Sequence, residues 1–154
     1  MRTLIIYMSV HHQNTLRVAT VMAEELAAEL VAVDQAPSPP LADYDLIGFG
    51  SGIFFGNHHK TLLAFVEALP AVTGKQAFIF STSGVGRTRD HALLRNVLVE
   101  RGYSILDEFS CKGWDSWGPL KLVGGINRGR PDAEDLEAAR VFARGLKARI
   151  QGTT

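Results

Sequence analysis

Short apolar runs alternate along the chain with segments whose apolar residues recur at helical spacing. The runs are typical of buried strands and lie at residues 4–8, 30–33, 46–50, 76–80 and 103–106. Helical spacing is clearest near the end, in the stripe Leu136, Ala139, Phe142, Ala143, Leu146 and Ile150. Strands that alternate with helices form a parallel sheet covered on both faces. The pattern therefore predicts an α/β fold in one domain over residues 1–154, with three layers and a doubly wound sheet of five parallel strands.

Polar loops follow the first, third and fourth of these predicted strands. They span residues 9–15, 50–57 and 81–86. Right-handed crossovers between parallel strands place such loops at the same edge of the sheet, which is where open α/β sheets bind ligands. We therefore expect the three loops to form one binding site.

The first loop has the composition of a phosphate site. Ser9 and Thr15 provide hydroxyls, Asn14 provides an amide and His11 an imidazole, and a predicted helix follows at once. The first N–H groups of a helix have no internal partner, and the helix dipole favours an anion at the same place. We expect these four residues to contact a phosphate.

The other two loops suit a flat ring. The loop at 50–57 places glycine backbone beside Phe54 and Phe55, and the loop at 81–86 begins with small polar residues that let a planar ligand approach the backbone. A phosphate site, an aromatic wall and a backbone edge together match a flat heterocycle that carries one phosphate. Flavin mononucleotide (FMN) is such a molecule.

At these loops, and at segment 129–132 before the last predicted helix, the chain resembles the flavodoxin family. It is most similar to short flavodoxin-like proteins that open with Ser-x-His-His-x-Asn-Thr, here residues 9–15. The resemblance covers nearly the whole length and implies strand order 2-1-3-4-5, non-covalently bound FMN and one-electron transfer without catalytic side chains. It places the phosphate at Ser9, His11, Asn14 and Thr15, and the flavin ring at Ser51, Gly52, Ile53, Phe54, Phe55, Thr82, Ser83 and Gly84.

Two tryptophans, Trp114 and Trp117, stand in a glycine-rich loop at 112–130. They do not match the tyrosine that often stacks on the flavin in this family. They could cover the cofactor, pack on the last helix or form a partner surface. We include Trp114 among the expected cofactor contacts.

The histidine pairs at 11–12 and 58–59 raise the alternative of a metal site. Adjacent histidines usually diverge, and no carboxylate or cysteine has a suitable spacing to complete such a site. Phosphate contact by His11 or His12, and plain surface positions, are the other interpretations.

Three functions follow as hypotheses. The first is an electron carrier that exchanges electrons with a redox partner protein or a small-molecule donor or acceptor. The second is an FMN-dependent reductase or oxidase linked to NAD(P)H, quinones or porphyrinogens, since one fold hosts many functions. The third is a flavin-free signalling domain, but a receiver domain needs acidic residues where this chain has Ser9-Val10 and Ser51-Gly52.

Composition limits the kinds of partner that the protein is expected to bind and the cell compartment in which it is expected to work. Sixteen basic residues balance 16 acidic ones, which argues against nucleic acid as a partner and against strong steering by charge. The sequence shows no secretory signal and no apolar run near the ~20 residues of a membrane span. Together with a single cysteine, Cys111, these features predict a cytoplasmic protein without a membrane span.

Overall fold

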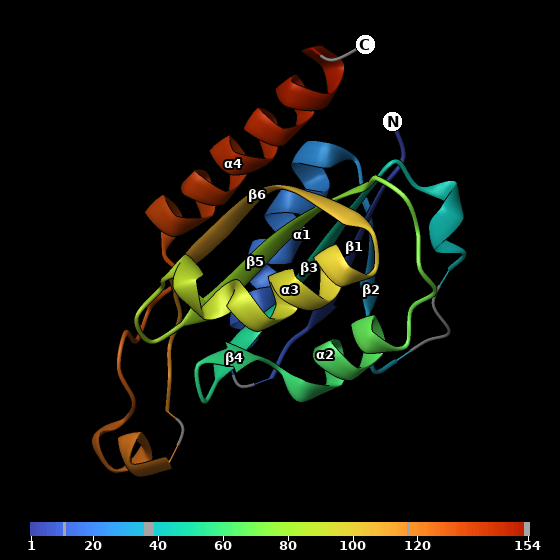
Figure 1. Ribbon diagram of the computed structural model, residues 1–154. Helices are drawn as coiled ribbons and strands as arrows, with labels where there is room; N and C mark the ends of the chain where they lie inside the picture. Colours follow the sequence, from blue (N-terminus) through green and yellow to red (C-terminus); the bar gives the residue numbers. More distant parts are fainter. Residues whose placement is uncertain (11, 36–38, 117, 153–154) are drawn as a thin grey trace.

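A parallel sheet lies at the centre of the computed structural model, which describes residues 1–10, 12–35, 39–116 and 118–152 (Figure 1). The strands run in the order β2-β1-β3-β5-β6. Their bounds are β1 Thr3–Met8, β2 Glu29–Ala32, β3 Leu46–Phe54, β5 Lys75–Ser83 and β6 Tyr103–Lys112. A short further strand, β4 (Asn57–His58), pairs antiparallel with the end of β3. Because β5 and β6 are the fourth and fifth predicted strands, the predicted fold and strand order are confirmed.

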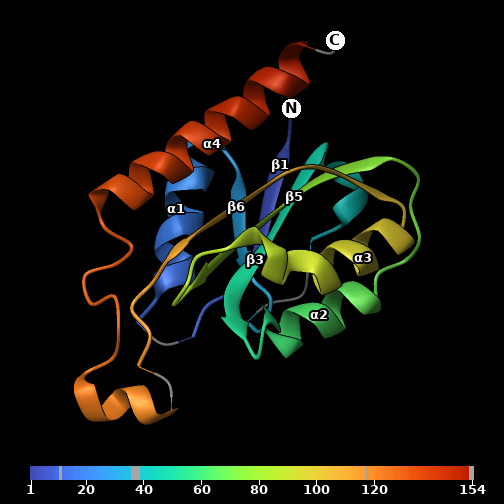
Figure 2. The ribbon, with the colours of Figure 1, turned by 60° about the vertical axis from the view of Figure 1, so that its left-hand side comes forward.

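Two pairs of helices cover the two faces of the sheet (Figures 1 and 2). One face carries α1 (Asn14–Leu26) and α4 (Ala133–Gly152), and the other carries α2 (Lys60–Glu67) and α3 (Ala92–Glu100). Short 3₁₀ turns lie in the connections, namely η1 (Leu41–Asp43), η2 (Thr88–His91) and η3 (Gly118–Val123). None of the described helices is long and apolar enough to cross a membrane.

The apolar cores on the two faces are built from alternate residues of the same strands. Phe49 and Ile79 belong to the core under α2 and α3, whereas Phe78 and Phe80 belong to the core under α1 and α4. Gly50 makes room for one of these rings, because a Cβ atom there would lie 2.3 Å from the ring of Phe80. The central strands are therefore covered by apolar cores on both faces, and the core under α1 and α4 is packed tightly against Gly50.

The strands β3 and β5 continue beyond the ends that their apolar runs predict. The sequence pattern places Ser51 and Ser81 in loops, but both serines lie inside strands. β3 then turns into β4 through Phe55 and Gly56, whose φ angles of 53° and 77° are both positive, as a type I′ hairpin turn requires. The second predicted loop is thus largely a β-hairpin.

Candidate functional site

A pocket opens at the carboxyl ends of the central strands, where the segment that follows β1 meets the ends of β3 and β5. Its cavity volume is about 190 Å³. Segment 113–115, which follows β6, contributes the remaining wall. The lining residues are Val10, Asn14, Thr15, Gly52, Ile53, Phe54, Phe55, Thr82, Ser83, Gly113, Trp114 and Asp115.

The amino end of α1 forms one side of this pocket. The hydroxyl of Ser9 accepts a hydrogen bond from the N–H of Leu16 at 3.2 Å and so caps the first turn. Thr15 is buried, and its hydroxyl lies 2.9 Å from the hydroxyl of Thr82 on β5. The helix thereby presents its partly positive end to the pocket.

The Trp114 segment is tied to the same loop. The ring of His12 stacks on Trp114, with centroids 3.5 Å apart and planes 13° apart. Nε2 of His12 is 2.7 Å from the hydroxyl of Ser116, and Nδ2 of Asn14 donates to the Trp114 carbonyl at 2.8 Å. A Cβ atom at Gly113 would lie 2.6 Å from Nδ2 of Asn14, so this close approach requires glycine. His12 and Asn14 therefore hold Trp114 at the pocket wall.

The hairpin of β3 and β4 forms another wall. The ring of Phe54 lies edge-on to His59 with centroids 5.1 Å apart, while Phe55 at the turn is 86% exposed. Ser51 anchors the base of the hairpin, since its hydroxyl accepts a hydrogen bond from the N–H of His59 at 2.9 Å and donates to the Gly52 carbonyl at 2.6 Å. Two aromatic rings are thus presented on a short, doubly anchored hairpin.

Most residues that the sequence analysis names as cofactor contacts lie around this one pocket. They are Asn14, Thr15, Gly52, Ile53, Phe54, Phe55, Thr82, Ser83 and Trp114. Ser9 and Ser51 lie outside the lining, because their hydroxyls cap α1 and anchor the hairpin. Gly84 also lies outside it, and its carbonyl accepts a hydrogen bond from Nδ2 of Asn127 at 2.7 Å.

The remaining predicted contact, His11, falls outside the described residues, as does Trp117. Conversely, the pocket contains Val10, Gly113 and Asp115, which the sequence analysis does not single out. All three lie next to positions that the sequence does indicate, because Val10 is inside the predicted phosphate loop and the other two flank Trp114.

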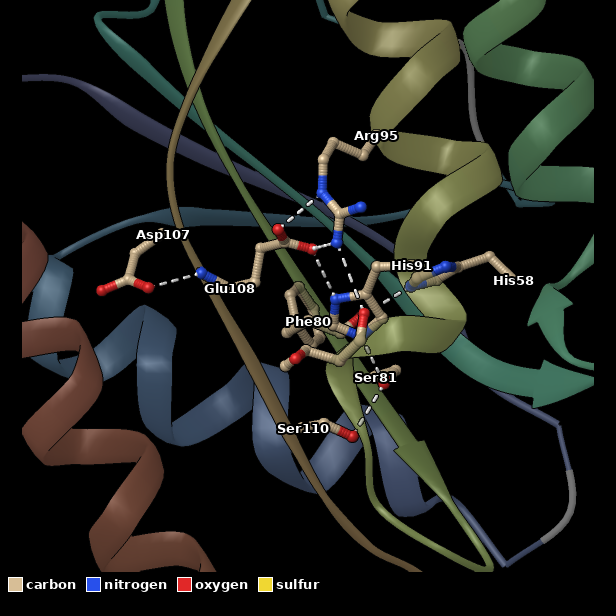
Figure 3. Close-up of polar contacts among 9 residues, drawn as sticks. His58, Phe80, Ser81, His91, Arg95, Asp107, Glu108 and Ser110 are labelled. Atoms are coloured by element: carbon tan, nitrogen blue, oxygen red, sulfur yellow. Dashed lines mark hydrogen bonds and ion pairs between the residues drawn. The ribbon is translucent and has the colours of Figure 1, made fainter.

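A set of buried and half-buried polar side chains lies on the sheet face covered by α2 and α3 (Figure 3). His91 at the end of η2 has no exposed surface, and its Nε2 is 2.7 Å from the hydroxyl of Ser81. Its Nδ1 lies 2.9 Å from Oε1 of Glu108. The two carboxylate oxygens of Glu108 also accept hydrogen bonds from Arg95, Oε2 at 2.7 Å and Oε1 at 2.8 Å. The hydroxyls of Ser81 and Ser110 are 3.0 Å apart. We call the set the buried histidine network: His58, Ser81, His91, Arg95, Glu108 and Ser110.

His58 brings the hairpin into this network. It is 2% exposed, and its ring centroid lies 4.9 Å from that of His91. Its Nε2 donates to the Phe80 carbonyl at 3.0 Å, whereas its Nδ1 is buried without a hydrogen-bond partner in the described part of the chain. Burial, and to a lesser extent the neighbouring His91, lowers the pKa of His58 to about 3. His58 is therefore neutral at physiological pH.

The positions of the other protons follow from the partners. Burial lowers the pKa of His91, although the hydrogen bond to Glu108 opposes this shift. Burial by itself would raise the pKa of Glu108, but the hydrogen bonds from Arg95 and His91 outweigh it and the pKa lies below its ordinary value. A neutral His91 beside an ionised carboxylate carries its proton on Nδ1, so its Nε2 accepts a hydrogen bond from the hydroxyl of Ser81.

Ser81, His91 and Glu108 are connected in the order of a hydrolytic triad, but burial excludes that chemistry. Ser81 has no exposed surface and does not line the pocket, so a substrate cannot reach its oxygen. No motif in the sequence marks the network. Ser51, Ser81 and Ser110 come into register only when β3, β5 and β6 pair.

The described residues contain no group of three or more His, Cys, Asp or Glu side chains that could hold a metal ion. The pair at 58–59 diverges, since His58 turns to the Phe80 carbonyl while Nδ1 of His59 accepts the N–H of Thr61 and caps α2. Cys111 is buried, and burial raises the pKa of its thiol to about 12. Among the described residues, those that line the pocket are therefore the best candidates for binding a ligand.

A parallel sheet of order β2-β1-β3-β5-β6, with polar loops gathered at its carboxyl edge, defines a flavodoxin-like α/β protein. Comparison of the sequence with known families agrees: the model of the flavodoxin domain matches residues 4–112. The chain therefore belongs to the flavodoxin family. An uncharacterized protein of Methanocaldococcus jannaschii is 43% identical over 148 residues, which cover 95% of this chain and 98% of that protein.

Solved structures share the fold over almost the whole chain. Oxidised Flavodoxin 2 from Bacillus cereus is 20% identical with a TM-score of 0.68, and the match covers 97% of this chain and 99% of that one. A flavodoxin from the domain Archaea is 14% identical with a TM-score of 0.67, covering 98% of this chain and 99% of that one. At these identities the likeness shows the fold alone.

Proposed function

We propose that this protein binds FMN non-covalently and transfers electrons one at a time through it. The observation that supports this most is the meeting of three kinds of surface in one pocket, namely a helix amino end, an aromatic hairpin and a small polar strand end. Flavodoxin-like proteins bind flavin, typically FMN, and this chain belongs to that family.

The α1 side of the pocket fits a phosphate. The N–H groups of Asn14 and Thr15 open the helix, where backbone donors have no intrahelical partner. The side chain of Asn14 is bonded to Trp114, so we assign phosphate contact to its backbone. The lining also contains one acidic residue, Asp115. Its carboxylate lies beside the third loop, since one of its oxygens is 3.3 Å from the place that a Cβ atom at Gly84 would occupy.

The rest of the pocket fits a flat aromatic ring. Phe54, Phe55 and Trp114 supply apolar surface, and Thr82 and Ser83 supply a backbone edge for hydrogen bonds to ring heteroatoms. Bound FMN would supply the redox chemistry, which side chains of this kind do not. The protein's own residues bind the ring, orient it and exclude water from one side.

A comparison of two flavins tests the phosphate and ring assignments together. We expect added FMN to lose its fluorescence on binding, and riboflavin, which has the same ring without the phosphate, to bind about 100-fold more weakly, because it forgoes charge-assisted hydrogen bonds. Equal affinities would contradict the phosphate assignment. A protein that is colourless as purified and does not bind added FMN would refute the proposal as a whole.

Stepwise reduction with dithionite tests the carrier role. A distinct absorbance species at one electron per flavin is the expected result for a one-electron carrier. Direct conversion from the oxidised to the fully reduced spectrum would argue against it.

A second candidate function is an FMN-dependent reductase or oxidase linked to NAD(P)H, a quinone or a porphyrinogen. It is favoured by positive charge beside the pocket: the guanidinium of Arg128 lies 5.2 Å from the Trp114 ring centroid, and exposed Lys112 precedes Gly113. Such charge suits the two anionic substrates of this set, NAD(P)H and a porphyrinogen. Sustained consumption of one of these substrates by the purified protein would identify an enzyme, whereas stoichiometric reduction without turnover would favour the carrier.

A further inference from the structure

Two walls of the pocket are joined by one buried side chain that does not itself line the pocket. His58 stands on β4 opposite Ile53 of β3, and the segment between them carries Phe54 and Phe55. Its Nε2 donates to the carbonyl of Phe80, two residues before Thr82 on β5. The imidazole of His58 therefore links the aromatic hairpin to the strand end that forms the polar edge.

The orientation of the His58 ring is set by the rest of the buried histidine network. The ring packs against His91, with the planes 54° apart. His91 is held at both nitrogens, by Ser81 and by Glu108, and Arg95 in turn holds the Glu108 carboxylate (Figure 3). A ring that is bonded at both nitrogens cannot rotate without breaking a hydrogen bond, so His91 gives His58 a fixed surface.

Packing alone does not explain a histidine at this place. The side chain is 2% exposed and leaves Nδ1 without a hydrogen-bond partner among the described residues. An apolar side chain of similar size would fill the same space without burying an unsatisfied nitrogen. What it could not supply is the directed bond from the hairpin to β5.

We propose that His58 is a positioning residue of the flavin site: its hydrogen bond to the Phe80 carbonyl holds the 53–58 hairpin in register with the end of β5, and His91 orients its ring for that bond. The proposal rests on the proposed function, because it treats the pocket as a flavin site. The positioning itself can be measured without flavin.

A matched pair of amides tests the bond. His58→Gln keeps an N–H donor at the position of Nε2, whereas His58→Asn is shorter and places its amide at the position of Nδ1. We expect His58→Asn to weaken FMN binding about tenfold or more, and His58→Gln to retain affinity within about threefold of the unsubstituted protein. Val97→Ala, on the same sheet face at the far end of α3, controls for loss of stability and should leave FMN affinity unchanged.

Amide hydrogen exchange of the ligand-free proteins gives a second readout. The hairpin amides at 53–58 should exchange faster in His58→Asn than in His58→Gln or Val97→Ala, at equal fractions folded. Equal hairpin exchange and equal FMN affinity in the two amide variants would overturn the proposal. Failure of the unsubstituted protein to bind FMN, with the exchange difference present, would instead overturn only the proposed function.

The unsubstituted protein offers a test that does not depend on any variant folding. At neutral pH, long-range ¹⁵N spectra of the imidazoles should show His58 as the Nε2–H tautomer, since the Phe80 carbonyl can only accept. The Nδ1–H tautomer would leave no donor for that carbonyl and would overturn the proposal.

Discussion

The two faces of the sheet differ most where the strands approach the pocket. On the face under α1 and α4, Gly50, Phe80 and Phe109 lie in register, and the Phe80 ring fills the space that glycine leaves. One residue further along, on the face under α2 and α3, the row consists of Ser51, Ser81 and Ser110. Their small side chains leave room for two imidazoles.

The same strands are therefore held together at the pocket end by different interactions on their two faces. The aromatic row acts through shape, because close-packed rings tolerate little added volume. The serine row lies beside buried histidines that are neutral, and protonating them would place a charge away from water. We expect substitutions that add volume to damage the first face most, and acid to damage the second.

The largest effect is expected from Gly50→Ala on the aromatic face. Its Cβ would stand 2.3 Å from the ring of Phe80, which has no exposed surface. We expect the free energy of unfolding, measured in urea, to fall by about 3 kcal/mol. Gly145→Ala on α4 is the matched control: with no atom within 4 Å of its Cβ position, it should gain about 0.5–1 kcal/mol from helix propensity. Equal effects of the two substitutions would contradict the packing argument.

The serine face should respond to pH. The pKa of His58 is about 3 in the folded protein, below the ~6.5 of an unfolded histidine, so the unfolded chain takes up a proton first as pH falls. From pH 7 to pH 5 this lowers the free energy of unfolding by about 2 kcal/mol, and the stability is regained on returning above pH 7. The lowered pKa of His91 acts in the same direction.

His58→Gln separates this contribution from those of other groups, because glutamine does not titrate. Its stability should decline less steeply between pH 7 and pH 5 than that of the unsubstituted protein. Parallel pH profiles, measured by urea unfolding at each pH, would show that His58 is not the group responsible.

The same comparison shows which parts of the molecule the sequence can predict. Strands buried on both faces are recorded in the chain as continuous apolar runs, so the alternation of strands and helices, and hence the fold, could be predicted. The loops that meet at the pocket followed from the crossover rule. The aromatic row is visible only in part, because Gly50 and Phe80 become neighbours through strand pairing.

The serine row could not be predicted, because a serine after an apolar run has the pattern of a loop. Ser51 and Ser81 stay in their strands since the fold supplies partners for their hydroxyls, the N–H of His59 and the ring of His91. His91 itself stands in the polar segment 87–91, where no apolar pattern marks a buried side chain. The contact of His12 with Trp114 spans about two thirds of the chain and has no local signal.

A smaller effect is expected from His12, which braces the pocket wall away from the serine face. His12→Ala removes the stack on Trp114 and the hydrogen bond to Ser116, both partly exposed to water. We expect unfolding to become easier by about 1 kcal/mol, measured in urea at pH 7. His12→Phe keeps the stack without the hydrogen bond and should recover part of this loss. If His12→Ala lowered the free energy of unfolding as much as Gly50→Ala, the loop that carries His12 would be as rigidly packed as the sheet.

The smallest and most informative change is at the hairpin turn, where strain and function are expected to oppose each other. Phe55 has a φ of 53°, a conformation that is unfavourable for a bulky residue, and it precedes Gly56 at the second turn position. Phe55→Asn creates the Asn-Gly pair that type I′ turns prefer, and the exposed ring loses little burial. We expect about 0.5 kcal/mol of added stability in urea unfolding, together with several-fold weaker FMN binding through loss of the aromatic wall.

Gly56→Ala is the opposite change at the same turn. It adds a side chain at φ 77°, and should destabilise the protein while leaving Phe55 in place. If Phe55→Asn raised stability with no change in FMN affinity, the strained ring would serve a surface other than the flavin pocket.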